Sequence, residues 1–73
     1  MGKLRVLSGS EVMAILRAKG FEEVRRRGSH VVMQKKTDGS TITVPVPDHK
    51  EIRRGTLAAI IRQSQLPRTL FEA

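Results

Sequence analysis

Apolar residues at helical spacing predict a first helix from about Gly9 to Lys19. Ser8, followed three residues later by Glu11, has the spacing of an N-terminal capping box. Gly20 is placed to end the helix in a left-handed turn, and Phe21 then folds back on the last turn. The predicted inward stripe consists of Val12, Ile15 and Leu16, with Met13 beside it.

Alternating apolar and polar residues then predict three short strands. The segment 21–27 is weakly patterned, and we expect Val24 to be its inward residue. The segments 29–36 and 40–46 are joined by Asp38-Gly39, a strong hairpin signal. A two-residue loop would place Lys35 opposite Ile42. In this register the residues that face the core are Val31, Met33, Ile42, Val44 and Val46. The residues on the open face are His30, Val32, Gln34, Thr41 and Thr43.

The C-terminal part of the chain predicts a second helix and a docked tail. Pro45 and Pro47 end the hairpin, and Pro45 indicates an edge strand. The helix is expected over about 56–63, with Thr56 as its cap. Apolar positions that face inward are Leu57, Ile60 and Ile61, followed by a tail of Leu66, Pro67, Leu70 and Phe71. The α-β-β-β-α order predicts an α+β fold in one domain over 1–73, with two helices covering one face of a three-stranded antiparallel sheet.

The charge of the chain points to a polyanionic partner. Fourteen lysines and arginines stand against seven acidic residues, which gives a formal net charge of +7. Such a surplus favours nucleic acid, because neutralising phosphates releases condensed counterions. A well-solvated surface or an acidic protein partner would also explain it. The only aromatic residues are Phe21 and Phe71, which argues against a platform on which bases stack.

Other classes of protein find little support in the composition. The absence of cysteine excludes disulfides and thiolate metal sites. Two histidines without a carboxylate at helical spacing do not make a zinc site, so we expect neither a metal nor a cofactor. No apolar run approaches the roughly 20 residues of a membrane span, and nothing indicates secretion. We therefore expect a cytoplasmic protein.

The two histidines, His30 and His49, are the candidates for proton transfer near neutral pH. Metal-free RNA cleavage needs a base for the 2′-hydroxyl, an acid for the leaving 5′-oxygen, and cations beside the phosphorane. Ser29 is placed to orient the His30 imidazole or to bind a phosphate. The candidate cations are Arg25, Arg26, Arg27, Lys35 and Lys36. Alternatively, His30 is an ordinary exposed histidine and His49 bonds loop backbone.

Several short motifs, taken in order, resemble the HicA (YcfA-like) toxin family over roughly residues 8–71. They are Gly20-Phe21, Gly28-Ser29-His30, the Asp38-Gly39 hairpin, the segment TVPVPDHKEI, and Gly55-Thr56-Leu57 with 60–63. The resemblance implies a fold like double-stranded-RNA-binding domains and a toxin of a type II toxin–antitoxin pair that cleaves mRNA independently of the ribosome. It also implies a HicB antitoxin that covers the active site. The family's catalytic histidine corresponds to His30, and its later Pro–His motif to His49.

Three functions follow, in order of preference. The first is a metal-independent ribonuclease toxin in which His30 transfers a proton, as base or as acid. The second is a non-catalytic RNA-binding module of the double-stranded-RNA-binding-domain type. The third is a protein whose positive charge complements an acidic partner and which does not act on RNA.

Overall fold

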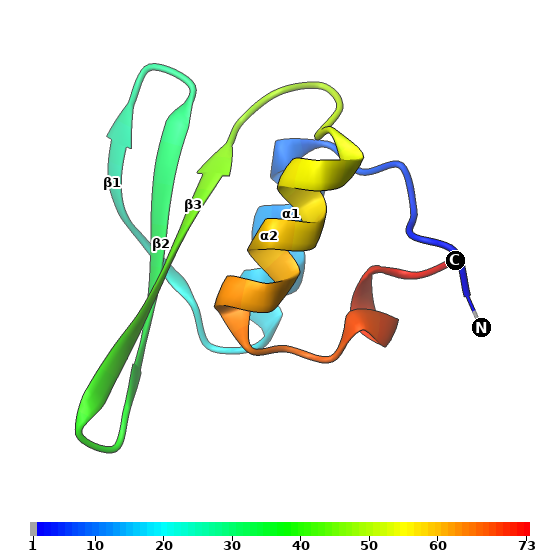
Figure 1. Cartoon of the computed structure of the whole chain (residues 1–73). Coiled ribbons are helices and arrows are strands. Elements are labelled where there is room, and N and C mark those ends of the chain that lie inside the picture. Colours follow the sequence, from blue (N-terminus) through cyan, green and yellow to red (C-terminus); the bar gives the residue numbers. More distant parts are fainter. Residues whose placement is uncertain (1) are drawn as a thin grey trace.

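The computed structural model describes residues 2–73 as a three-stranded antiparallel sheet with two helices on one side (Figure 1). In chain order the elements are α1 (Gly9–Ala18), β1 (Glu22–Arg27), β2 (His30–Thr37), β3 (Ser40–Pro47), α2 (Arg54–Ser64) and the short 3-10 helix η1 (Arg68–Phe71). The strands are ordered β1-β2-β3. The α-β-β-β-α order confirms the predicted α+β, double-stranded-RNA-binding-domain-like fold. Neither α1 nor α2 is long and apolar enough to span a bilayer.

Helix α1 begins and ends as its local sequence predicts, to within one residue. The Ser8 hydroxyl accepts from the Glu11 amide at 3.1 Å, and the Glu11 carboxylate accepts from the Ser8 amide at 2.9 Å. This reciprocal capping box satisfies two of the helix's free N–H groups. At the other end Gly20 has φ +96°, and the Phe21 amide donates to the Leu16 carbonyl at 3.0 Å. The helix ends at Ala18. Met13 is buried, whereas Ile15 is only partly buried.

The β2–β3 register confirms the prediction made from the Asp38-Gly39 turn. Val31 lies opposite Val46, Met33 opposite Val44, and Lys35 opposite Ile42. The first two pairs are fully buried beneath the helices, and Ile42 packs at the margin of the core. The remaining buried apolar residues are Leu7, Val12, Met13, Leu16, Phe21, Ile52, Leu57, Ile60, Ile61 and Phe71. Burial of Phe71 confirms that the C-terminal tail docks on the core.

The prediction that Val24 faces inward is wrong: the residue before it, Glu23, lies on the core side of the sheet, and β1 contains a β-bulge at Val24. Glu23 lies opposite Met33, whereas Arg25 lies opposite the adjacent residue, Val32, so Val24 is the additional residue of β1. Val24 is 51% exposed. Strict alternation fails after this position, since the bulge reverses which face each later residue of the strand occupies.

Helix α2 begins earlier than predicted and without Thr56 as its cap. Its first residue is Arg54, its N-cap is Arg53, and no side chain caps it. The Leu57 amide donates to the Arg53 carbonyl at 2.8 Å, which places Thr56 inside the first turn. The prediction relied on the capping preference of one threonine. The helix is instead stabilised by the burial of its inward apolar residues and needs no side-chain cap.

Gly9 brings α1 against the loop between β3 and α2. Its amide donates to the His49 carbonyl at 2.8 Å. A Cβ atom built on Gly9 would lie 2.6 Å from the Asp48 Cα and closer still to the Pro47 carbonyl oxygen. Such separations do not occur between real atoms, so any other residue at position 9 must push the helix and the loop apart.

We expect Gly9→Ala to destabilise the protein by about 1–3 kcal/mol, the usual cost of forcing additional atoms into a packed contact. Urea unfolding measures it. Gly55→Ala is the matched control, because Gly55 also lies in the first turn of a helix and a Cβ there would meet nothing within 4 Å. The control should keep or slightly raise the free energy of unfolding. Equal destabilisation of both variants would contradict the close contact at Gly9.

The capping box predicts a pH-dependent contribution to stability. The backbone and side-chain hydrogen bonds from Ser8 lower the pKa of Glu11 below its ordinary value of 4.5. A lowered pKa in the folded state stabilises the fold above the unfolded-state pKa, and this stabilisation is lost as the pH falls through the folded-state pKa. Unfolding midpoints of wild type and Glu11→Gln should therefore differ at pH 7 and converge in acid. A difference that stays constant with pH would refute this.

Candidate active site

His30 is exposed at the start of β2, on the face of the sheet away from the helices. In the ladder it lies between Arg27 of β1 and Pro47 of β3. Its neighbour Val31 points into the core and is fully buried. Pairing on both sides fixes the backbone of His30, while its imidazole stays accessible to solvent.

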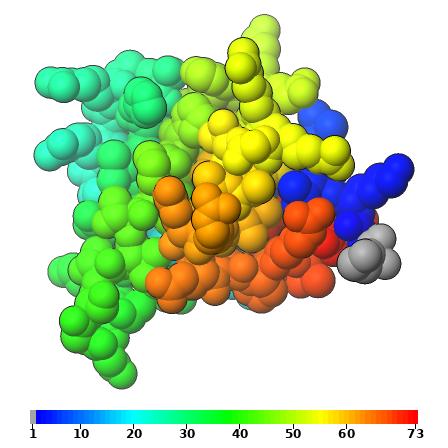
Figure 2. Space-filling view, viewed as in Figure 1, coloured from blue at the N-terminus to red at the C-terminus, as the bar shows by residue number. Residues whose placement is uncertain are grey.

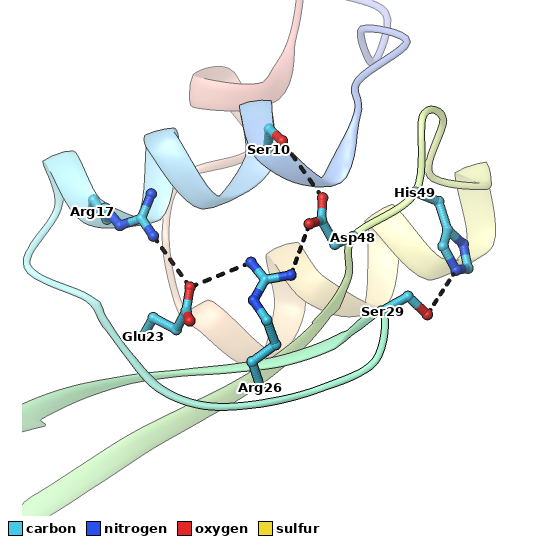
Figure 3. A network of polar contacts seen from close by, with 7 residues as sticks. All are labelled: Ser10, Arg17, Glu23, Arg26, Ser29, Asp48 and His49. Atoms are coloured by element: carbon cyan, nitrogen blue, oxygen red, sulfur yellow. Dashed lines mark hydrogen bonds and ion pairs between the residues drawn. The ribbon is translucent and has the colours of Figure 1, made fainter.

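The turn before His30 is made by Gly28 and Ser29. Gly28 has φ +59°, a conformation that costs glycine little and other residues more. The Ser29 carbonyl accepts from the Asp48 amide at 2.6 Å, which ties this turn to the β3–α2 loop. The Ser29 hydroxyl also lies 3.3 Å from Nε2 of His49 (Figure 3). The residue next to His30 therefore contacts the second histidine directly.

The two predicted histidines line one surface hollow of about 440 Å³. Sites for small molecules commonly have volumes of roughly 300–1,000 Å³, so the hollow can receive a nucleotide-sized group. The other residues of its lining are Pro45, Pro47, Glu51, Ile52, Arg53 and Thr56. The two histidines, far apart in the sequence, line the same hollow because β3 runs beside β2 and its loop turns back toward α2.

A polar network holds the loop that carries His49 (Figure 3). Arg26 Nη1 donates to the Asp48 carboxylate at 2.9 Å, and the Ser10 hydroxyl lies 3.5 Å from the other carboxylate oxygen. Arg26 also pairs with Glu23 at 3.5 Å, and Glu23 pairs with Arg17 at 3.4 Å. The hydrogen bond to Asp48, and then that to Glu23, raises the pKa of Arg26. Arg26 therefore links β1 to the loop.

The six predicted RNA-binding residues do not share one surface. Arg25 and Arg27 lie opposite Val32 and His30, on the open face of the sheet. Arg26 lies opposite Val31, on the side of the helices. Ser29 lies beside His49, as described above.

The two lysines lie far along β2 from the histidine. Lys36 is on the open face, opposite Thr41. Lys35 is on the other face, with its ammonium 6.0 Å from the centre of the Phe21 ring. At about 3.3 Å per residue, both lie roughly 15–20 Å from His30. They are near the tip of the β2–β3 hairpin, which projects beyond the rest of the molecule (Figure 2).

Sequence reasoning missed the residues that complete the site. Asp48 anchors the loop, and the lining residues Glu51, Arg53 and Thr56 surround the histidines. The sequence did contain a signal for Asp48. This residue directly precedes His49, and its negative charge can pair with one of the three consecutive arginines. No sequence signal marked Glu51, Arg53 and Thr56, because these residues come near His30 only when the chain folds back toward β2.

Comparison with known proteins identifies the family. No curated protein sequence gives a significant match to the chain. The family described as the HicA toxin of bacterial toxin–antitoxin systems matches residues 9–66, which run from α1 to just beyond α2. The match covers well over half of the 73 residues and includes both histidines, the turn before His30 and the loop around Asp48. The chain therefore belongs to the HicA family of toxins.

Proposed function

We propose that this toxin is a metal-independent endoribonuclease that cleaves mRNA, with His30 as a catalytic residue. The observation that carries the proposal is the shared hollow of His30 and His49 on a strongly basic member of the HicA family. Two imidazoles lining one cavity can supply the acid and the base that cleavage at a 2′-hydroxyl needs.

The reaction follows from that requirement. One imidazole removes the proton of the ribose 2′-hydroxyl, and the oxygen attacks the adjacent phosphorus. The bond from phosphorus to the 5′-oxygen breaks, and the second imidazole, protonated, gives its proton to that oxygen. The products are a 2′,3′-cyclic phosphate and a 5′-hydroxyl. Each positioned group contributes about 10²–10⁴-fold to the rate.

The surrounding structure supports such positioning. The β ladder fixes His30 from both sides, and the loop of His49 is held by main-chain bonds to Gly9 and Ser29. The Asp48 carboxylate adds a bond to Arg26. Catalytic groups that are held before the substrate arrives lose little entropy on reaction.

The cations of the open face would bind the RNA backbone. We assign this role to Arg25, Arg27 and Lys36, and a phosphate contact to the Ser29 hydroxyl. Arg53 lines the hollow and is placed to stabilise charge that develops on the phosphorane. Arg26 and Lys35, on the side of the helices, would support the fold instead.

The partner of a toxin in this family is an antitoxin. We infer that it is a HicB-like protein and that it covers the hollow of His30 and His49, which would block access of cytoplasmic RNA. An acidic surface on that protein would complement the net charge of +7 and speed the association.

We expect His30→Ala to lower RNA cleavage by at least about 100-fold, since one proton-transfer group is removed. The fold should be unchanged, because the His30 side chain is exposed. A labelled single-stranded RNA incubated with each protein in EDTA measures cleavage, and circular dichroism checks the fold. Cleavage by the variant at the wild-type rate would refute the role of His30. Intact RNA with wild type that nonetheless binds it would favour the non-catalytic RNA-binding module.

His49 is tested separately by the pH dependence of the rate. With two proton-transfer groups, the wild-type profile of kcat against pH should be bell-shaped. In His49→Ala one limb should disappear, and kcat should fall about 100-fold. Ser29→Ala is the control: it removes the contact to His49 and the proposed phosphate contact but leaves both imidazoles, so both limbs should remain. Retention of both limbs in His49→Ala would show that another group acts beside His30.

A further inference from the structure

The additional residue in β1 decides which arginines accompany His30. Glu23 lies opposite Met33 on the core side of the sheet. Strict alternation from Glu23 would turn Arg25 to the core side as well. Instead, Val24 is the additional residue, and Arg25 lies opposite Val32 on the open face. The bulge therefore reverses the faces of all three arginines.

The three arginines consequently have different surroundings. Arg27 lies directly opposite His30, and Arg25 lies on the same face, two residues along the strand. Residues directly opposite in a sheet have Cβ atoms about 5 Å apart, so the Arg27 side chain is a neighbour of the imidazole. Arg26 points to the other side and reaches Asp48 (Figure 3).

The arginines on the two faces of the sheet also differ in whether an acidic side chain neutralises their charge. Arg26 pairs with both Glu23 and Asp48. Within residues 2–73, Arg25 and Arg27 form no ion pair. Their neighbours in the ladder, Val32 and His30, carry no negative charge. Two unneutralised guanidinium groups thus lie on the histidine's face.

We propose that Arg25 and Arg27 bind two successive phosphates of an RNA strand that lies along β1 and passes His30, and that Arg26 is instead a positioning residue for the His49 loop. The proposal rests on the ribonuclease function proposed above. Alternate residues of a strand are about 6.6 Å apart, which is close to the spacing of successive phosphates in an extended single strand. The planar fork of arginine suits a phosphate oxygen pair.

The experiment measures how the affinity for RNA depends on salt. The probe is a single-stranded RNA with 2′-O-methyl groups, which lacks the attacking hydroxyl and is not cleaved. Arg25→Gln/Arg27→Gln is compared with Arg26→Gln/Lys35→Gln; each pair of substitutions lowers the net charge from +7 by the same two charges. Any effect of net charge alone is therefore equal in the two variants.

We expect the slope of log K against log salt to become shallower by about 1.4 in Arg25→Gln/Arg27→Gln, because each neutralised phosphate of a single strand contributes about 0.7 to it. The slope of Arg26→Gln/Lys35→Gln should stay at the wild-type value. With unmodified RNA, Arg25→Gln/Arg27→Gln should chiefly raise KM. Arg26→Gln should chiefly lower kcat, because it loosens the loop of His49.

Equal slopes for the two double variants would overturn the proposal, as would a wild type that does not bind the probe. Failure of the ribonuclease function is distinguishable from both results. In that case wild type and variants would show the expected slopes with the probe, yet unmodified RNA would stay intact. The single variants Arg25→Gln and Arg27→Gln should each make the slope shallower by about 0.7, half the change expected for the double variant.

Discussion

The contact between the first turn of α1 and the β3–α2 loop is the constraint on which the site depends. Gly9 lets the two backbones touch, and its amide binds the His49 carbonyl at 2.8 Å. The same loop is bound by Ser29 through its main chain and by Arg26 through Asp48. A helix, a turn and a strand thus converge on this short loop. The position of His49 relative to His30 is a result of tertiary packing.

The basic surface and the core are arranged by the same alternation of the strands. Val31 and Met33 bury their side chains under the helices, which leaves His30 and Val32 on the open face. The β-bulge in β1 then places Arg25 and Arg27 on the open face with His30, and Arg26 on the side of the helices. What distinguishes these cations in the structure is their location: Arg26 is paired with Glu23 and Asp48 on the side of the helices, whereas Arg25 and Arg27 lie on the open face.

Local signals in the sequence were sufficient for most of the fold and for the exposed position of His30 in the candidate site. The Asp38-Gly39 turn predicted the register, and the register predicted an exposed His30. The capping box predicted the start of α1. The bulge at Val24 left no such signal, because an additional residue in a polar edge strand changes no apolar pattern. The hollow was equally hidden, since its two histidines come from elements that only tertiary packing brings together.

The prolines of β3 restrict how another protein can cover the hollow. Pro45 and Pro47 lie in the edge strand and line the site. Because neither residue has an N–H, an added strand would find no main-chain donor at these two positions. A strand added to this edge would therefore be held by fewer main-chain hydrogen bonds than one added to an edge without proline. The edge that borders the histidines is thus a poor template for backbone pairing, which favours recognition by side chains there.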